Sequence, residues 1–328
     1  MIDDIMMLRT SPANLIIDTD MGNDVDDALA LALAHSLEWR GACRLLAVTL
    51  TNPDPLAGVY VDALNRFYGR PGIPIGISPD APRVSASRFL SVAQATDPAT
   101  GDRLYPSGHD ARTAPRSLDV LRRTLADAQD NSVVIVQIGF FTNLAALLDS
   151  PPDAASPLAG TGLVKRKVRF LSLMAGAFLP VDGNEHRLEF NVRHAIPAAQ
   201  RVVADWPTPA VWSGWEVGNA IRFPASAIDH GYAWATRHIL PESYQAFEPT
   251  PHERPTYDLT SVLHAVWPEH SHFNLSEPGR VIVENDGFTR LAHAPTGEGR
   301  DRILSVTPIQ AARLRGLFEA LCTEPSPV

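Results

Sequence analysis

Cysteine and lysine are scarce in this chain of 328 residues. Cysteine occurs only at Cys43 and Cys322, far apart in the sequence, which argues against a disulfide framework and against a thiolate metal site. Lysine occurs only at Lys165 and Lys167, in a basic stretch that we expect to form a turn, so a lysine nucleophile has almost no candidates. Because a reducing compartment suits such a sequence best, we predict a cytoplasmic protein.

Clustered positive charge and long apolar runs are also missing. The net charge of −9 and the pI near 5.6 argue against binding to nucleic acid or to a membrane surface, since both rest mainly on clustered lysine and arginine. No stretch approaches the ~18 uninterrupted apolar residues of a membrane span, and the apolar run within Met1–Met7 is too short for a signal peptide. We therefore expect a small-molecule partner.

Carboxylates, in contrast, are concentrated near the N-terminus. Five of them, Asp18, Asp20, Asp24, Asp26 and Asp27, fall within ten residues, between an apolar run and an Ala/Leu-rich segment. An acidic helix start would explain Asp24 or Asp26, with Asp27 in the first turn. It does not explain Asp18 and Asp20, which follow directly on the apolar run. Five like charges repel one another unless a cation offsets them, and hard oxygen ligands favour calcium or magnesium over zinc. The cluster therefore predicts a metal-binding functional site.

The periodicity of apolar residues predicts an α/β fold. Short apolar runs alternate with helical segments, which is typical of a mainly parallel, doubly wound sheet of the Rossmann-like open type with helices on both faces. Strands are expected at 15–17, 45–51, 133–138, 168–174 and 210–212, and helices at 27–37, 55–67, 117–129, 142–149, 195–204, 261–266 and 308–321. No linker divides the chain, so we expect one domain over 1–328. Irregular regions at about 78–116 and 223–257 are expected to act as lids.

The motif Asp18-Thr19-Asp20-x-Gly22, followed by Asp26-Asp27, resembles the amino-terminal signature of the inosine-uridine preferring nucleoside hydrolases. These enzymes cleave the N-glycosidic bond of ribonucleosides. Further similar segments follow in the order expected of that family: Leu45–Asn52, Val136–Ala145, Leu173–Gly176, Gly183-Asn184, Glu189–Asn191 and Tyr257-Asp258. The resemblance spans about 15–321 and implies hydrolysis of ribonucleosides to ribose and free base, in purine or pyrimidine salvage, by a homodimer or homotetramer.

The resemblance also implies a calcium ion at the bottom of the pocket. Its protein ligands would be Asp20, Asp27, the backbone carbonyl of Ile138, and Asp258. Calcium takes six to eight oxygen ligands, so a water and the two vicinal ribose hydroxyls could complete the shell. Asp20 would also be the general base that takes a proton from the calcium-bound water as it attacks the anomeric carbon.

The remaining matched residues would bind the ribose. By resemblance, Asp26 would accept a hydrogen bond from the 2-hydroxyl, and Met174 would pack against the sugar. Further ribose contacts would come from Asn52, Asn184, Glu189 and Asn191. If the segment around Glu189 is extended, Glu189 and Asn191 would share one face of it.

Two positions depart from the family pattern. Met21 replaces a proline, and the loop contains two extra residues, so Asp24 is either an additional ligand or points to solvent. Tyr257 stands where many members have a histidine that protonates the departing base, and a phenol with a pKa near 10 is a poorer acid at neutral pH. Substitute acids would be His109, His186 or His252, although a surface role is favoured for each.

Two other functions stay open. One is a non-catalytic calcium- and ribose-binding homologue that has lost the leaving-group acid. The other, less favoured, is a haloacid-dehalogenase-like phosphatase, which also places an aspartate nucleophile after its first strand but needs a downstream lysine. The sequence does not specify the nucleobase. Aromatic candidates for stacking on it, for which packing roles are favoured, are Phe178, Tyr232, Trp234 and Tyr244.

Overall fold

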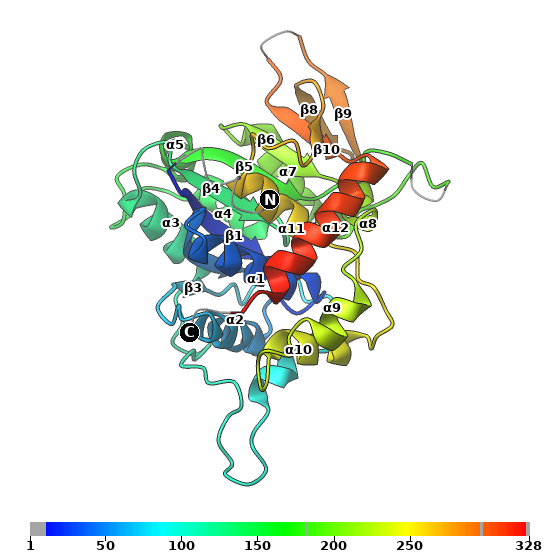
Figure 1. Cartoon of the computed structure of the whole chain (residues 1–328). Helices are drawn as coiled ribbons and strands as arrows, with labels where there is room; N and C mark the ends of the chain where they lie inside the picture. The colour runs from blue at the N-terminus through cyan, green and yellow to red at the C-terminus, as the bar shows by residue number, and fades with distance from the viewer. Residues whose placement is uncertain (1–10, 181–182, 296–297, 326–328) are drawn as a thin grey trace.

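A sheet of ten strands runs through the computed structural model, which describes residues 11–180, 183–295 and 298–325 (Figure 1). The strands are β1 (Ala13–Thr19), β2 (Cys43–Leu50), β3 (Ile75–Gly76), β4 (Val133–Gln137), β5 (Val168–Met174), β6 (Ala210–Ser213), β7 (Asn274–Leu275), β8 (Gly279–Val283), β9 (Thr289–His293) and β10 (Asp301–Ser305). Their order is β3-β2-β1-β4-β5-β6-β10-β8-β9, with β7 paired to β10. Pairing is parallel from β3 to β10, which confirms the predicted open parallel sheet.

Two hydrophobic clusters pack on opposite faces of this sheet. Along β1, Leu15 and Ile17 belong to one cluster and Ile16 to the other, because successive side chains of a strand point to opposite faces. Strands buried on both faces have no polar face, which is why their sequences read as continuous apolar runs. The sheet is therefore covered by helices on both sides, as predicted.

The helices divide between these two faces. The long helices are α1 (Asp26–Trp39), α2 (Pro55–Phe67), α10 (Ile239–Phe247), α11 (Tyr257–Val266) and α12 (Pro308–Thr323) on one face, and α3 (Ser117–Asp127), α4 (Thr142–Asp149), α5 (Gly160–Lys167) and α7 (Ile196–Asp205) on the other. Shorter helices are η2 (Leu90–Gln94), α6 (Phe190–Arg193), α8 (Trp215–Asn219) and α9 (Ala225–His230). In the described part of the chain, no helix has the length and hydrophobicity that a membrane span requires.

Three local predictions differ from the structure. Lys165 and Lys167 lie in the last turn of α5 rather than in a turn between elements. The region 223–257 is not irregular throughout, because it contains α9 and α10. The hairpin of β8 and β9, which projects at the top of Figure 1, was not among the predicted strands, and only part of each of its strands is buried.

The order of the strands reverses between β1 and β4, and this reversal fixes where a ligand can bind. In doubly wound sheets the loops at such a switch point diverge and leave a crevice beyond the carboxyl ends of the strands. Here the loops after β1 and β4 begin with Asp20 and Ile138. Gly22 has a φ of 114°, a conformation that L side chains rarely adopt, and it turns the first loop toward α1.

Candidate active site

A cavity of about 400 Å³ opens at this switch point. The acidic floor of the pocket consists of buried carboxylates, which are Asp20, Asp26, Asp27, Glu189 and Asp258. The other lining residues complete the wall. They are Asn23, Asp24, Arg88, Ile138, Met174, Arg187, Leu188, Phe190, Asn191, Arg193, Trp215, Phe247, Arg254 and Tyr257. Apart from Asn52 and Asn184, every residue that the family resemblance predicts as a metal ligand, general base or ribose contact lines this cavity.

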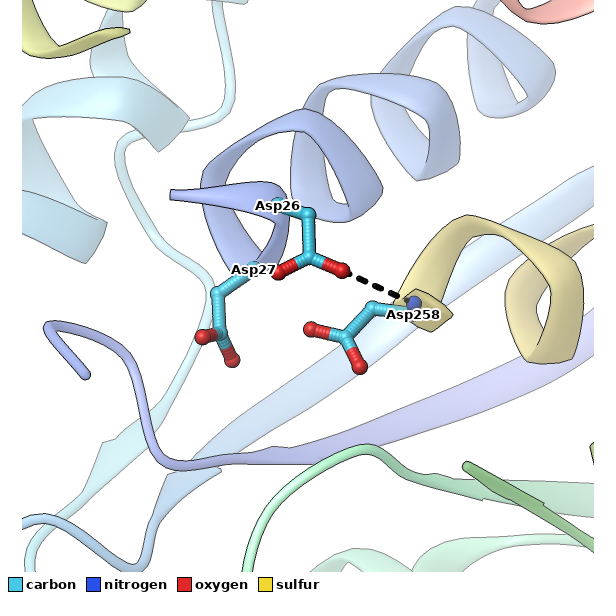
Figure 2. Close-up of side chains that lie close together, drawn as sticks. All are labelled: Asp26, Asp27 and Asp258. Atoms are coloured by element: carbon cyan, nitrogen blue, oxygen red, sulfur yellow. Dashed lines mark hydrogen bonds between the residues drawn. The ribbon is translucent and has the colours of Figure 1, made fainter. Parts of the chain in front are cut away.

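Three of the carboxylates converge closely enough to share a cation. One ligand atom from each of Asp26, Asp27 and Asp258 can be chosen so that all three lie within 4.8 Å of one another. Figure 2 shows the first turn of α1, with Asp26 and Asp27, facing the first turn of α11, with Asp258. The backbone N–H of Asp258 donates to Oδ2 of Asp26 at 3.2 Å, so the α11 terminus is fixed on α1.

The electrostatics of this group fit a bound metal ion. Burial raises the pKa of Asp26, Asp27 and Asp258 well above the usual range. Repulsion from neighbouring carboxylates, which for Asp26 comes from Asp24, raises each pKa further. Oδ2 of Asp27 is buried and has no hydrogen-bond partner among the described residues. A divalent cation would keep these carboxylates ionised and would give the unpaired oxygen a partner.

Asp20 lies beside this group, at the end of β1. Its Oδ2 accepts a hydrogen bond from Nδ2 of Asn23 at 2.8 Å. Burial raises the pKa of Asp20 to about 7, and the nearby Asp24 and Glu189 contribute repulsion. Asp20 in turn raises the pKa of Asp27, so the two carboxyls are electrostatic neighbours.

Polar contacts behind the floor hold its loops in place. Oδ1 of Asp18 accepts hydrogen bonds from Oγ1 of Thr49 at 2.6 Å and from Nδ2 of Asn143 at 2.7 Å, which ties β1 to β2 and α4. Nδ2 of Asn52 donates to the carbonyl of Met21 at 3.0 Å, so Asn52 supports the β1 loop from outside the cavity lining. The β4 loop also approaches the β1 loop closely, because a Cβ on Gly139 would lie only 2.4 Å from the backbone nitrogen of Asp20.

Glu189 and Asn191 lie at the N-terminal end of α6 and not in an extended segment. Glu189 caps α6, and its carboxylate accepts from the backbone N–H groups of Asn191 at 2.8 Å and Gly176 at 3.0 Å. Nδ2 of Asn191 donates to the carbonyls of Met174 at 3.0 Å and Ile138 at 3.4 Å. These contacts fasten α6 across the ends of β4 and β5.

Asp24 and Asn184 lie in different surroundings. Asp24 lines the pocket wall, where it forms an ion pair with Arg254 and lies near Asp26, so it does not point to open solvent. Asn184 is exposed, and its Oδ1 accepts from the backbone N–H of His186 at 2.9 Å.

Tyr257 is the first residue of α11 and lines the cavity, with its ring centroid 5.8 Å from that of Trp215. Burial raises the pKa of this phenol further, so it stays protonated at neutral pH. The cavity lining contains none of the substitute acids. His186 pairs with Asp286, His252 lies near Glu248, and His109 packs on α2.

The arginines and most aromatic residues of the wall were not anticipated. The four stacking candidates pack elsewhere, whereas Phe190, Trp215 and Phe247 line the cavity beside Tyr257. The arginines of the wall are Arg88, Arg187, Arg193 and Arg254. The arginines stand singly in loops and in the short helix α6, so no local sequence pattern marks them as pocket residues.

An open doubly wound sheet, with buried carboxylates converging at its switch point, defines an α/β protein with a pocket that can hold a metal ion and a polar ligand. The sequence model for the inosine-uridine preferring nucleoside hydrolases matches residues 15–302, so the chain belongs to this family. Both the resemblance inferred from the motifs and the expected reaction class, ribonucleoside hydrolysis, are thereby confirmed.

Solved structures share the fold over nearly the whole chain. The plant nucleoside hydrolase PpNRh1 is 20% identical, with a TM-score of 0.72 and coverage of 96% of this chain and 100% of its own. A purine-preferring ribonucleoside hydrolase from Gardnerella vaginalis is 18% identical, with a TM-score of 0.70 and coverage of 94% and 99%. The type III effector protein XopQ, complexed with adenosine diphosphate ribose, is 17% identical, with a TM-score of 0.64 and coverage of 95% and 94%. No match was found among the curated proteins.

Proposed function

We propose that the chain hydrolyses the N-glycosidic bond of a ribonucleoside by direct attack of water, with Asp20 as the general base. The observation that carries this proposal is the position of Asp20 beside the converging carboxylates of Asp26, Asp27 and Asp258, in a pocket that also presents hydrogen-bonding groups. Asp20 would accept one proton from the water while the water oxygen bonds to the anomeric carbon.

The donor set fits calcium. Asp20, Asp27, Asp258 and the carbonyl of Ile138 would hold the ion, since all four residues line the cavity and offer only oxygen ligands. When bound, the cation would acidify a water molecule and orient the ribose hydroxyls. Asp26 lies within the same group, so its carboxylate can accept the 2-hydroxyl while its other oxygen retains the N–H of Asp258.

The ribose would lie on the acidic floor, against Met174 and near Glu189 and Asn191. Negative charge around the sugar stabilises the positive charge that develops in an oxocarbenium-like transition state. The predicted ribose contacts of Asn52 and Asn184 rest on the resemblance alone, because both residues lie outside the cavity lining.

Leaving-group activation would fall to Tyr257. Its protonated phenol can donate a hydrogen bond to the departing base from the pocket wall. Two segments, 78–116 and 223–257, contribute Arg88, Phe247, Arg254 and Tyr257 to this wall, so we propose that they act as lids within a single domain over 1–328. We further propose a cytoplasmic homodimer or homotetramer that serves nucleoside salvage.

Release of reducing sugar from inosine, uridine and p-nitrophenyl β-riboside tests this proposal, with calcium and with chelator. We expect calcium-dependent hydrolysis of all three, and at least 10²-fold slower turnover in D20N, because a positioned base contributes that much. Hydrolysis of the nitrophenyl riboside alone would place the defect at Tyr257. Ribose binding without any turnover would favour the non-catalytic homologue, and phosphatase activity would favour the haloacid-dehalogenase-like alternative.

A further inference from the structure

The arginine rim of the pocket consists of Arg88, Arg187, Arg193 and Arg254, and it lies above the acidic floor. The floor carboxylates are buried, whereas these four arginines are partly or fully exposed, so the positive charges stand nearer the entrance. The lining of this cavity of about 400 Å³ therefore carries two separate sets of charges, carboxylates on its floor and arginines on its rim.

Aromatic rings fix the position of this arginine rim. The guanidinium carbon of Arg88 lies 3.7 Å from the ring centroid of Phe247, and that of Arg254 lies 5.1 Å from the same ring. On another part of the wall, the guanidinium carbon of Arg187 lies 3.5 Å from the ring centroid of Trp215. Stacking on aromatic faces orders a guanidinium while leaving its N–H groups free in the plane to bind a ligand.

Within the described part of the chain, three of the four arginines have no acidic partner. Arg254 pairs with Asp24, whereas Arg88, Arg187 and Arg193 form no ion pair within 4.0 Å in the described residues. Nε of Arg187 is also buried without a hydrogen-bond partner among those residues. A neutral nucleoside would leave these positive charges uncompensated as it displaced water from the entrance.

A phosphoryl group satisfies the same donors. Its oxygens accept bidentate hydrogen bonds from the planar guanidinium, and its charge at pH 7 is about −1.5 to −2. On a ribose whose 2′- and 3′-hydroxyls rest on the acidic floor, the C5′ substituent and the base are the groups that can extend toward the entrance. Phosphate at C5′ therefore places negative charge at the arginines and away from the carboxylates.

We propose that the pocket accepts N-ribosyl compounds phosphorylated on the 5′-oxygen, with Arg88, Arg187 and Arg193 as the phosphoryl-binding residues. This inference rests on the proposed function for the orientation of the ribose. In the reaction, the C1′–N bond breaks and its electron pair leaves on the base nitrogen, while the water oxygen bonds to C1′. One water proton passes to Asp20, the base takes up a proton, and the products are ribose 5-phosphate and free base.

Binding and turnover should be measured separately with the full chain in calcium. Isothermal titration with inosine, inosine 5′-monophosphate and ribose 5-phosphate gives the affinities. Nicotinamide adenine dinucleotide is titrated as well, because its C5′ phosphoryl group is part of a diphosphate and not a monophosphate. We expect the monophosphate or the dinucleotide to bind at least about tenfold more tightly than inosine, because each charge-assisted hydrogen bond contributes about that factor or more. This preference should weaken as salt is raised.

Matched substitutions locate the effect. R88Q and R187Q should each reduce the affinity for the phosphorylated compound about tenfold relative to the affinity for inosine. R313Q is the control, because Arg313 is exposed on α12 and lies outside the cavity lining. Its substitution changes the net charge by the same amount as R88Q or R187Q. It should leave this ratio unchanged.

The outcomes separate this inference from the proposed function. Equal or weaker binding of both phosphorylated compounds relative to inosine, or equal loss in R313Q and R187Q, would overturn the inference even if inosine is hydrolysed. Tighter, arginine-dependent binding without hydrolysis of any N-ribosyl compound would support the phosphoryl site and refute the proposed function. No binding of any of the compounds would overturn both.

Discussion

Replacing Gly139 by alanine should impair catalysis by moving the general base. The added Cβ would lie 2.4 Å from the backbone nitrogen of Asp20 and 2.5 Å from Oγ1 of Thr51. Because ordinary contacts begin near 3.4 Å, the loop after β1 must shift by about 1 Å. Gly139 does not have a positive φ, so the backbone tolerates alanine and the contact alone causes the effect.

The size of this effect follows from the displacement. Overpacking of this kind lowers the free energy of unfolding by about 1–3 kcal/mol. A misplacement of about 1 Å in an active site can lower kcat about 10²-fold. Steady-state kinetics on a ribonucleoside, combined with thermal unfolding, would measure both quantities on the same preparation.

Gly162 supplies the matched control. It lies exposed in α5, where a Cβ would meet only Cβ of Leu158 at 3.9 Å, so G162A should keep kcat unchanged and stabilise the helix by about 0.5–1 kcal/mol. Wild-type kcat and stability in G139A would refute the argument that the β1 and β4 loops are in obligatory contact. Loss of stability with unchanged kcat would show that Asp20 tolerates the shift.

Three further outcomes are expected. Calcium at 100 times its Kd should raise the free energy of unfolding by about 2.7 kcal/mol, as measured by denaturant titration, and a similar gain in D258N would argue against that carboxylate as a ligand. Y257F should lower kcat/KM for inosine about tenfold and for p-nitrophenyl β-riboside much less, whereas equal losses would exclude a role in leaving-group activation. Burial lowers the pKa of His264 from 6.5 to about 4, so the unfolded chain binds more protons between these values and stability falls as the pH drops through them. Relative to H264L, the wild type should therefore lose about 2 kcal/mol between pH 7 and 4.5, and parallel stability curves would refute this assignment.

The strands at the centre of the sheet could be predicted because their burial on both faces leaves a continuous apolar signal. The runs at 133–138 and 168–174 correspond to β4 and β5 within one residue. The hairpin of β8 and β9 escaped prediction because only part of each strand is buried. The short helix α6 escaped too, since four residues carry no helical period and its start depends on capping by Glu189.

The sequence by itself indicated the reaction class, through the resemblance to a known family, and the part of the acidic floor that comes from the N-terminal carboxylates. Asp18, Asp20, Asp26 and Asp27 are near neighbours in the chain, and a parallel α/β pattern directs the end of their strand into the ligand-binding edge of the sheet. Local spacing was therefore enough to mark these residues as a candidate metal site.

Only the tertiary structure decided how distant groups meet in the pocket and which arginines and aromatic rings complete its wall. It placed Asp258 against Asp26, paired Asp24 with Arg254, and set Arg187 on Trp215 at the entrance. These contacts join segments far apart in the chain, and each depends on how helices and loops pack over the sheet. A lone arginine in a loop has no periodic signal, so its place beside the pocket emerges only once the chain is folded.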